Sequence, residues 1–180
     1  MEELNRVMQD RRRKMEALRE QGVNPFANGF SPSATCMQLL TRAGETAPPQ
    51  MDALTDDAPC HRVAGRIVSK NKMGKATFMR IRDRSVGVAE DGPQYLQIYL
   101  RKDRIGADDY LMLRSLDVGD TIGVEGPLFL TRTGEPSVMV DRGQLLTKSL
   151  RPLPEKWHGL ADVETRYRQR YVDLIVNPGV

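Results

Sequence analysis

Hydrophobic and polar residues alternate with two different periods along this chain of 180 residues. In the first twenty residues, apolar positions recur three and four residues apart, which predicts an amphipathic helix that stops near Gly22. Residues 24–60 show no sustained period and contain five prolines. Two segments in this region, 35–41 and 51–54, are candidates for short helices. We interpret residues 1–60 as an N-terminal helix and arm.

From His61 onward the period changes to two, which is typical of β-strands. The pattern predicts three strands at 62–70, 76–83 and 95–101, a short helix at 108–116, and two further strands around the turn Thr133-Gly134-Glu135. This order of elements is that of an OB-fold, although other small barrels share it. We therefore expect a mainly β protein with helices, in which a five-stranded OB-fold Greek-key barrel at 61–147 follows the N-terminal helical arm.

The last segment, residues 148–180, is predicted to be a linker and the start of a further domain. Pro152 and Pro154 stiffen the connection, and a charged helix is expected from Ala161 to Ile175. Its apolar positions are sparse, and a stripe of that kind usually packs on another part of a protein.

Composition excludes several classes of protein. Hydrophobic residues make up 39% and charged residues 28% of the chain, and no stretch approaches the roughly 18 apolar residues of a membrane span. The N-terminus lacks the apolar segment of a signal peptide, and two cysteines give neither a disulfide framework nor zinc spacing. We therefore expect a reduced, cytoplasmic setting, with no membrane and no metal site. The total net charge of +3 is only a weak indication of nucleic-acid binding. Residues 61–142 carry 14 basic and 11 acidic side chains, so the predicted barrel carries part of the excess positive charge.

Two predicted strands present an unusual set of side chains on one face. Phe78, Arg80 and Arg82 alternate with apolar residues in the second strand, and Tyr95, Gln97, Tyr99 and Arg101 do so in the third. Aromatic rings interleaved with guanidinium groups and an amide can stack bases, bind phosphates and read a base edge. The alternative is that the aromatic residues cover a barrel end or pack under the N-terminal helix. The run RRRK at 11–14 is open to similar alternatives: a solvated helix face, an RNA contact or a subunit contact.

Enzymatic chemistry has no support in these residues. His61 and His158 are distant in sequence and neither belongs to a nucleophile motif, and the chain has no glycine-rich phosphate-binding loop. We predict no catalytic residue and no cofactor for this chain.

Five stretches carry a resemblance to a known family: RRRKMEALREQGVNPFANGF, VAGRIVSKNKMGKATFM, GVEGPLF, TGEPS and LLTKSLRPLPEKWHGLADVETRYRQRYVDLIVN. From about Leu4 to Asn177 the chain resembles the N-terminal part of bacterial-type class II lysyl-tRNA synthetases. The resemblance implies that the barrel binds the U-rich anticodon of lysine tRNA. It also implies a cytoplasmic, homodimeric parent enzyme that attaches lysine with ATP and Mg²⁺. The signature motifs of the catalytic domain are absent here, so the chain alone is expected to be inactive.

The resemblance also implies particular contacts. Phe78 corresponds to the aromatic residue that stacks on the middle base, Gln97 to the amide that reads a base edge, and Glu135 to a glutamate of the turn. The arginine that follows the first strand in the family falls at Lys70, which keeps the charge but loses the planar fork. The full candidate site for anticodon binding, with basic residues expected to meet phosphates or to stack, is Phe78, Gln97, Glu135, Lys70, Arg66, Arg80 and Arg82.

Two rival functions remain open at this point. One is a non-catalytic dimerisation or assembly module that uses the first helix and the tail helix. The other is a single-strand nucleic-acid binder on the same barrel that ignores base sequence.

Overall fold

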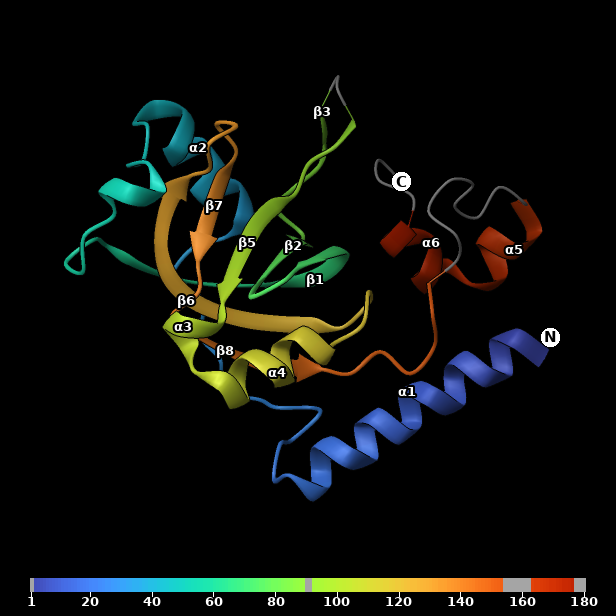
Figure 1. The fold of residues 1–180 in the computed structure, drawn as a ribbon. Helices are drawn as coiled ribbons and strands as arrows, with labels where there is room; N and C mark the ends of the chain where they lie inside the picture. Colours follow the sequence, from blue (N-terminus) through green and yellow to red (C-terminus); the bar gives the residue numbers. More distant parts are fainter. Residues whose placement is uncertain (1, 90–91, 154–162, 177–180) are drawn as a thin grey trace.

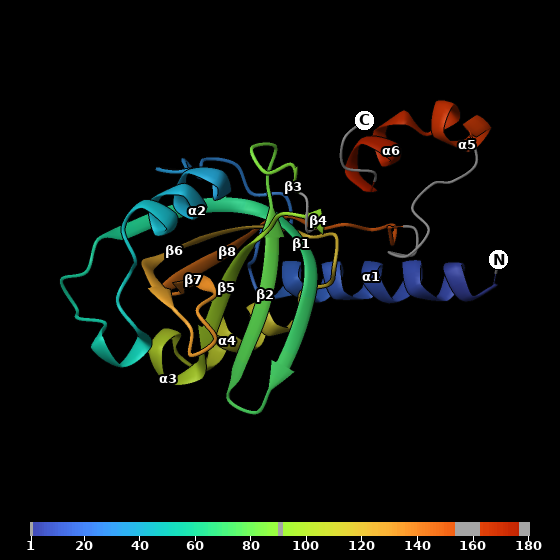
Figure 2. The ribbon, with the colours of Figure 1, turned by 90° about the horizontal axis from the view of Figure 1, so that it is seen from above.

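The sheet is organised by β1 (Cys60–Met73), a strand of 14 residues that pairs with two different strands. Its first half pairs antiparallel with β6 (Thr121–Leu130), and its second half pairs antiparallel with β2 (Ala76–Arg82). The computed structural model describes residues 2–89, 92–153 and 163–176, and Figures 1 and 2 show β1 bending across the sheet. Because one strand serves two neighbours, the sheet closes on itself.

The closed barrel has the strand order β1-β2-β5-β7-β6, and β6 returns to β1. β5 (Leu96–Arg101) pairs antiparallel with β2 and parallel with β7 (Pro136–Met139), which pairs antiparallel with β6. This arrangement confirms the predicted five-stranded OB-fold barrel. β8 (Arg142–Thr147), which the pattern did not predict, adds to β6, while β3 (Val88–Ala89) and β4 (Gly92–Pro93) form a separate small hairpin.

The core of the barrel follows from the alternation in its strands. In β2, Met79 and Ile81 are buried, whereas Phe78, Arg80 and Arg82 are only half-buried. In β5 the buried apolar side chains are Leu96, Ile98 and Leu100. The predicted inner and outer faces of both strands are therefore confirmed.

Helices cover two parts of the barrel. α2 (Cys36–Glu45) begins with a capping box, in which Thr35 Oγ1 accepts from the Gln38 N–H and the Gln38 side chain accepts from the Thr35 N–H. α3 (Lys102–Ile105) and α4 (Ala107–Ser115) lie at one end of the barrel (Figure 1), where the Tyr110 hydroxyl lies 3.1 Å from Thr77 Oγ1. The helix predicted at 108–116 is thus confirmed, and the one at 35–41 runs further. The candidate helix at 51–54 is a short 3-10 helix, η1 (Met51–Ala53).

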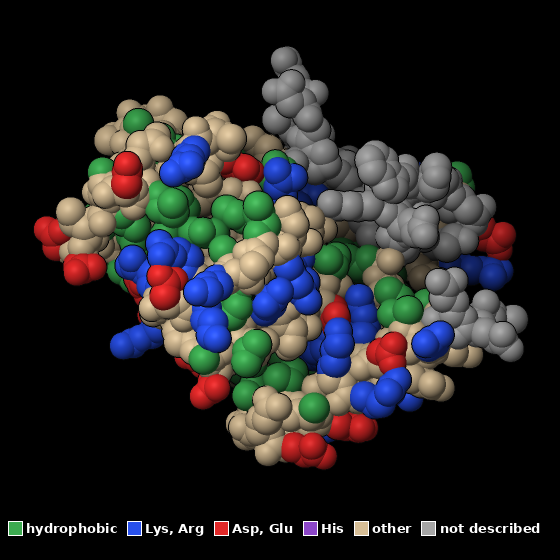
Figure 3. Space-filling view, viewed as in Figure 1, with side chains coloured by type: hydrophobic (Ala, Val, Ile, Leu, Met, Phe, Trp, Pro, Cys, Tyr) green, Lys and Arg blue, Asp and Glu red, His purple; other side chains and the backbone are tan. Residues whose placement is uncertain are grey.

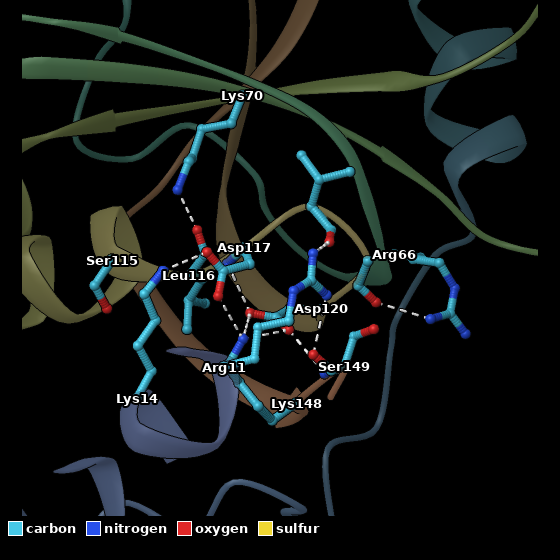
Figure 4. Close-up of polar contacts among 12 residues, drawn as sticks. Arg11, Lys14, Arg66, Lys70, Ser115, Leu116, Asp117, Asp120, Lys148 and Ser149 are labelled. Atoms are coloured by element: carbon cyan, nitrogen blue, oxygen red, sulfur yellow. Dashed lines mark hydrogen bonds and ion pairs between the residues drawn. The ribbon is translucent and has the colours of Figure 1, made fainter. Parts of the chain in front are cut away.

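The predicted N-terminal helix is α1 (Glu2–Glu20), which projects beyond the barrel in Figures 1 and 2. Gly22, at φ 76°, follows its end. The helix is held by the buried Arg11, whose guanidinium donates to the carbonyl oxygens of Val118 (2.9 Å) and Ser149 (3.0 Å). Figure 4 shows this contact beside an ion pair of 2.5 Å between Lys14 and Asp117. Backbone carbonyls of the barrel therefore orient the arm.

The tail differs from its prediction. In place of one helix over 161–175, the tail forms two short helices, α5 (Val163–Arg168) and α6 (Arg170–Val176). Both lie away from the barrel in Figures 1 and 2. Residues 161–162 and His158 lie outside the described residues. Few apolar side chains are available to bury a continuous helix, and Tyr167 and Tyr171 are exposed. No helix in the described ranges combines the length and the apolar character needed to cross a membrane.

Candidate nucleic-acid interface

A hollow of about 360 Å³ lies on the outer face of the barrel, where β1, β2 and β5 meet the turn between β6 and β7. Aromatic, cationic, anionic and amide groups converge there within a small volume. The hollow is lined by Ser69, Lys70, Asn71, Phe78, Arg80, Gln97, Thr131, Thr133 and Glu135. Five of the seven predicted site residues line it: Lys70, Phe78, Arg80, Gln97 and Glu135.

Strand register brings these side chains together. Phe78 of β2 lies opposite Asn71 of β1 and Tyr99 of β5. Arg80, two residues further on the same face, lies opposite Gln97. Because antiparallel neighbours in direct register have their Cβ atoms about 4.5–5.5 Å apart, these five strand positions form a continuous surface.

Phe78 is held by stacking within the protein. Its ring lies 4.4 Å from the Tyr99 ring, centroid to centroid, with 23° between the planes, and Tyr99 in turn contacts Phe129 at 5.9 Å. One face of the Phe78 ring is thus covered, while the residue lines the hollow. An aromatic ring supported from behind offers a preformed platform for a planar ligand.

Arg80 is fixed by two contacts at the rim. Its guanidinium carbon lies 4.0 Å above the centre of the Tyr95 ring, and Nη2 lies 3.5 Å from Glu135 Oε1. Burial, together with the Glu135 carboxylate, raises the pKa of the Tyr95 hydroxyl above its ordinary value. The Arg80 guanidinium is therefore held in place by the Tyr95 ring and the Glu135 carboxylate.

Gln97 belongs to the outer face although it is only 7% exposed. Its Nε2 donates a hydrogen bond of 2.9 Å to Ser137 Oγ on the parallel neighbour β7. The residue also lines the hollow, so the insertion before β5 does not turn it into the core. An amide anchored on one side has its other polar atom available for a ligand.

Lys70 differs from its expected position. The register of β1 shifts at a bulge between Ile67 and Ser69, so Lys70 pairs with the buried Met79 and its ammonium takes the face opposite to Phe78. Figure 4 shows Lys70 directed toward the end of α4, where Nζ donates to the carbonyl oxygens of Arg114 (3.1 Å) and Leu116. Burial and the nearby Lys72 lower the pKa of Lys70 to about 8. Lys70 thus contributes to the wall of the hollow, while its ammonium group binds the carbonyl oxygens at the C-terminal end of α4. This corrects the expectation that Lys70 takes the place of the family's arginine.

Arg66 and Arg82 form a cross-strand pair that does not line the hollow. Arg66 Nη1 donates to the Gly119 carbonyl oxygen at 2.8 Å, and Arg82 Nη2 donates to that of Val86 at 3.5 Å. Burial lowers the pKa of both guanidinium groups from the ordinary value. The two arginines therefore lie on the predicted face but hold neighbouring loops.

Several residues of the hollow were missed by sequence reasoning. Asn71, across from Phe78, occupies the outward position that the bulge takes from Lys70. Ser137, which holds Gln97 but does not itself line the hollow, was missed because the two residues are 40 positions apart in the sequence. Thr131 and Thr133 belong to the same turn as Glu135, and this shared turn is the one signal that could have identified them.

The surface around these elements favours an anionic ligand. Figure 3 shows Lys and Arg side chains gathered across the middle of the viewed face, with fewer Asp and Glu among them. A supported aromatic ring, an anchored amide and a fixed guanidinium within a basic surface are the groups that bind unpaired nucleotides.

Comparison with known proteins assigns the class of this domain. Residues 61–146 match the tRNA_anti-codon family, described as an OB-fold nucleic acid binding domain. The barrel is therefore a tRNA anticodon-binding OB-fold domain.

Nearly the whole chain is similar to lysine–tRNA ligases of bacteria. It is 45% identical over 174 residues, 97% of the chain, to the lysine–tRNA ligase of Anaeromyxobacter sp. (strain K). The identity is 45% over 179 residues with that of Pelotomaculum thermopropionicum and 46% over 180 residues with that of Magnetococcus marinus. The chain spans about a third of the length of these curated relatives, 32% to 34%.

Proposed function

We propose that the chain binds the anticodon loop of lysine tRNA in the hollow and reads its U-rich bases. One observation carries the proposal: a single hollow brings together the Phe78 ring, the Gln97 amide and the Glu135 carboxylate. The similarity to lysine–tRNA ligases supports lysine tRNA as the particular partner.

Each side chain has a distinct task in this proposal. A base stacks on the uncovered face of Phe78, and Gln97 and Glu135 form hydrogen bonds to base edges. Arg80 meets a phosphate or stacks beside a base. Arg66 and Arg82 add positive charge beside the hollow, and Lys70 shapes its wall rather than offering its ammonium.

The same proposal extends to the longer protein that such a domain serves. There it would take part in attaching lysine to tRNA with ATP and Mg²⁺, in a cytoplasmic homodimer. We assign no lysine, ATP or magnesium ligand to this chain and expect the chain alone to be inactive in aminoacylation. Incubation with lysine, ATP and tRNA tests this, since charged tRNA would contradict it.

Binding at the hollow can be mapped directly. In an NMR titration of the chain with a lysine anticodon stem-loop, amide shifts should change along β2, β5 and the turn at 131–135. Shifts confined to α1 and the tail would contradict the proposed site, and so would a titration without any change.

A second candidate, an assembly module, is favoured by a specific observation. Leu4 of α1 is 51% exposed, and Tyr167, Tyr171 and Leu174 of the tail helices are 80%, 61% and 56% exposed. Sedimentation distinguishes the two functions: a chain that dimerises tightly but ignores tRNA would support assembly. Equal affinity for every unpaired oligonucleotide would instead support a binder that ignores sequence.

A further inference from the structure

The amide of Gln97 takes part in a short chain of hydrogen bonds buried between β5 and β7. Its Nε2 donates to Ser137 Oγ at 2.9 Å, and Ser137 Oγ lies 3.2 Å from the carbonyl oxygen of Glu135, to which it donates. Ser137 is fully buried, at 0% exposed, so water does not replace either bond. The hydroxyl therefore links Gln97 to the backbone of the turn.

The chemistry of the hydroxyl determines how the amide is oriented. A serine hydroxyl carries one proton, and here it is given to the Glu135 carbonyl, so the oxygen can only accept from Gln97. If the amide turned over, its oxygen would face Ser137 and would need that same proton. With the amide turned over, the chain from Gln97 through Ser137 to Glu135 would thus keep one hydrogen bond in place of two.

Electrostatics favour the same orientation. Arg80 is the cross-strand neighbour of Gln97 on the face of the hollow, and its guanidinium is held there by Tyr95 and Glu135. The partly negative amide oxygen is attracted to this cation, while the amide NH₂ would be repelled. Both effects direct Gln97 Oε1 toward the hollow.

We propose that Ser137 is a positioning residue, which fixes the Gln97 amide so that its carbonyl oxygen selects a base with an N–H donor at the facing edge. This inference rests on the proposed function and deepens it. Uracil offers N3–H, whereas cytosine carries a lone pair on N3 that the amide oxygen repels. A freely turning amide would accept both bases, because its NH₂ can donate to the lone pair.

The test is a double-mutant cycle in the uridine preference of the chain. Dissociation constants are measured for lysine anticodon stem-loops with uridine or cytidine in the middle position, using wild type, Ser137→Ala, Gln97→Ala and the double variant. Ser137→Ala should lower the preference roughly 3- to 10-fold, the value of about one hydrogen bond. The same change should have no further effect in the Gln97→Ala background, because Ser137 acts through Gln97.

Two variants control for loss of structure. Ser115→Ala removes a serine hydroxyl outside the hollow, one that donates to the Met112 carbonyl oxygen, and it should keep the wild-type preference. Ser137→Cys keeps the volume but offers a weak acceptor, so it should lower the preference without unfolding the barrel. An equal loss of preference by Ser137→Ala with and without Gln97 would overturn the proposal, as would an unchanged preference.

An NMR measurement on the free chain makes the contact testable without RNA. A nuclear Overhauser effect is expected between a Gln97 Nε2 proton and the Ser137 Hβ protons, and its absence would overturn the positioning role. Equal binding of both stem-loops by wild type, with the Overhauser effect present, would refute the proposed base readout and the selection by Gln97. The two failures are thus distinguishable.

Discussion

At the scale of single residues, the binding role proposed for Phe78 depends on its neighbours. Tyr99 supports one face of its ring at 4.4 Å, and the residue lines the hollow. Phe78→Ala should therefore lower affinity for the lysine anticodon stem-loop by about 1–3 kcal/mol. Fluorescence anisotropy measures the loss. Phe26→Ala, which removes an exposed ring outside the hollow, is the matched control, and equal affinities of the two variants would contradict the stacking role.

Arg80 is expected to act on the phosphate backbone rather than on one base. Arg80→Ala should weaken binding of different anticodon stem-loops alike and reduce the slope of log K against log salt by about 0.7–1. Titrations at several salt concentrations provide the measurement. A loss of affinity restricted to one anticodon would show that Arg80 reads a base.

Lys70 should titrate far from the ordinary range of a lysine. Its pKa is lowered to about 8 by burial and by Lys72, whereas the unfolded chain keeps the ordinary value of 10.5. Between these two values the folded protein releases a proton that the unfolded chain retains, so the contribution to the free energy of unfolding rises with pH in that window. NMR titration of the Lys70 side chain should give a midpoint near 8, and Lys70→Gln should remove this rise. A midpoint at 10 or above would contradict the account.

At the scale of elements, a buried charge cluster joins β6, β8 and α1. Asp120 is 0% exposed and accepts from Lys148 Nζ (2.9 Å) and from the backbone N–H groups of Asp117 (2.7 Å) and Ser149 (2.8 Å). Figure 4 shows these groups converging beside Arg11. The cluster fixes the start of β6 and the exit of the chain from β8 relative to the helical arm.

Removing the carboxylate would leave the buried ammonium of Lys148 without its main counter-charge. Asp120→Ala should therefore lower the free energy of unfolding by about 3–5 kcal/mol, measured by urea denaturation. Asp103→Ala removes an exposed carboxylate paired with Arg101 and should leave the denaturation midpoint nearly unchanged. If both variants unfolded at the same urea concentration, the cluster would have no structural role.

The strands also show how far the sequence predicts the site. Period-two alternation placed Phe78, Arg80 and Gln97 on the outer face, because local backbone geometry determines which way successive side chains point. The bulge at 67–69, by contrast, depends on how β1 pairs with two partners, so it displaced Lys70 and left Asn71 unrecognised. The contact of Gln97 with Ser137 joins strands distant in sequence, and the break between α5 and α6 follows no strong local signal.

For the molecule as a whole, barrel closure is the step that creates the hollow. The pairing of β1 with β6 and the parallel pairing of β5 with β7 bring the turn at 131–135 over the outer face of β2 and β5. The arm and the tail lie away from this surface in Figures 1 and 2, which leaves their exposed apolar side chains for other contacts. The proposed recognition surface and the exposed apolar side chains of the arm and tail therefore lie on different parts of the molecule.

The most direct test of the central claim compares two RNAs. Binding of the chain to a lysine anticodon stem-loop is measured beside the same stem-loop with the middle uridine replaced by cytidine, at moderate salt. We predict a clear preference for uridine, because a base stacked on Phe78 is read at its edge by Gln97. Equal affinity for the two stem-loops would contradict base readout by the hollow, and the absence of binding to either would contradict the proposed function itself.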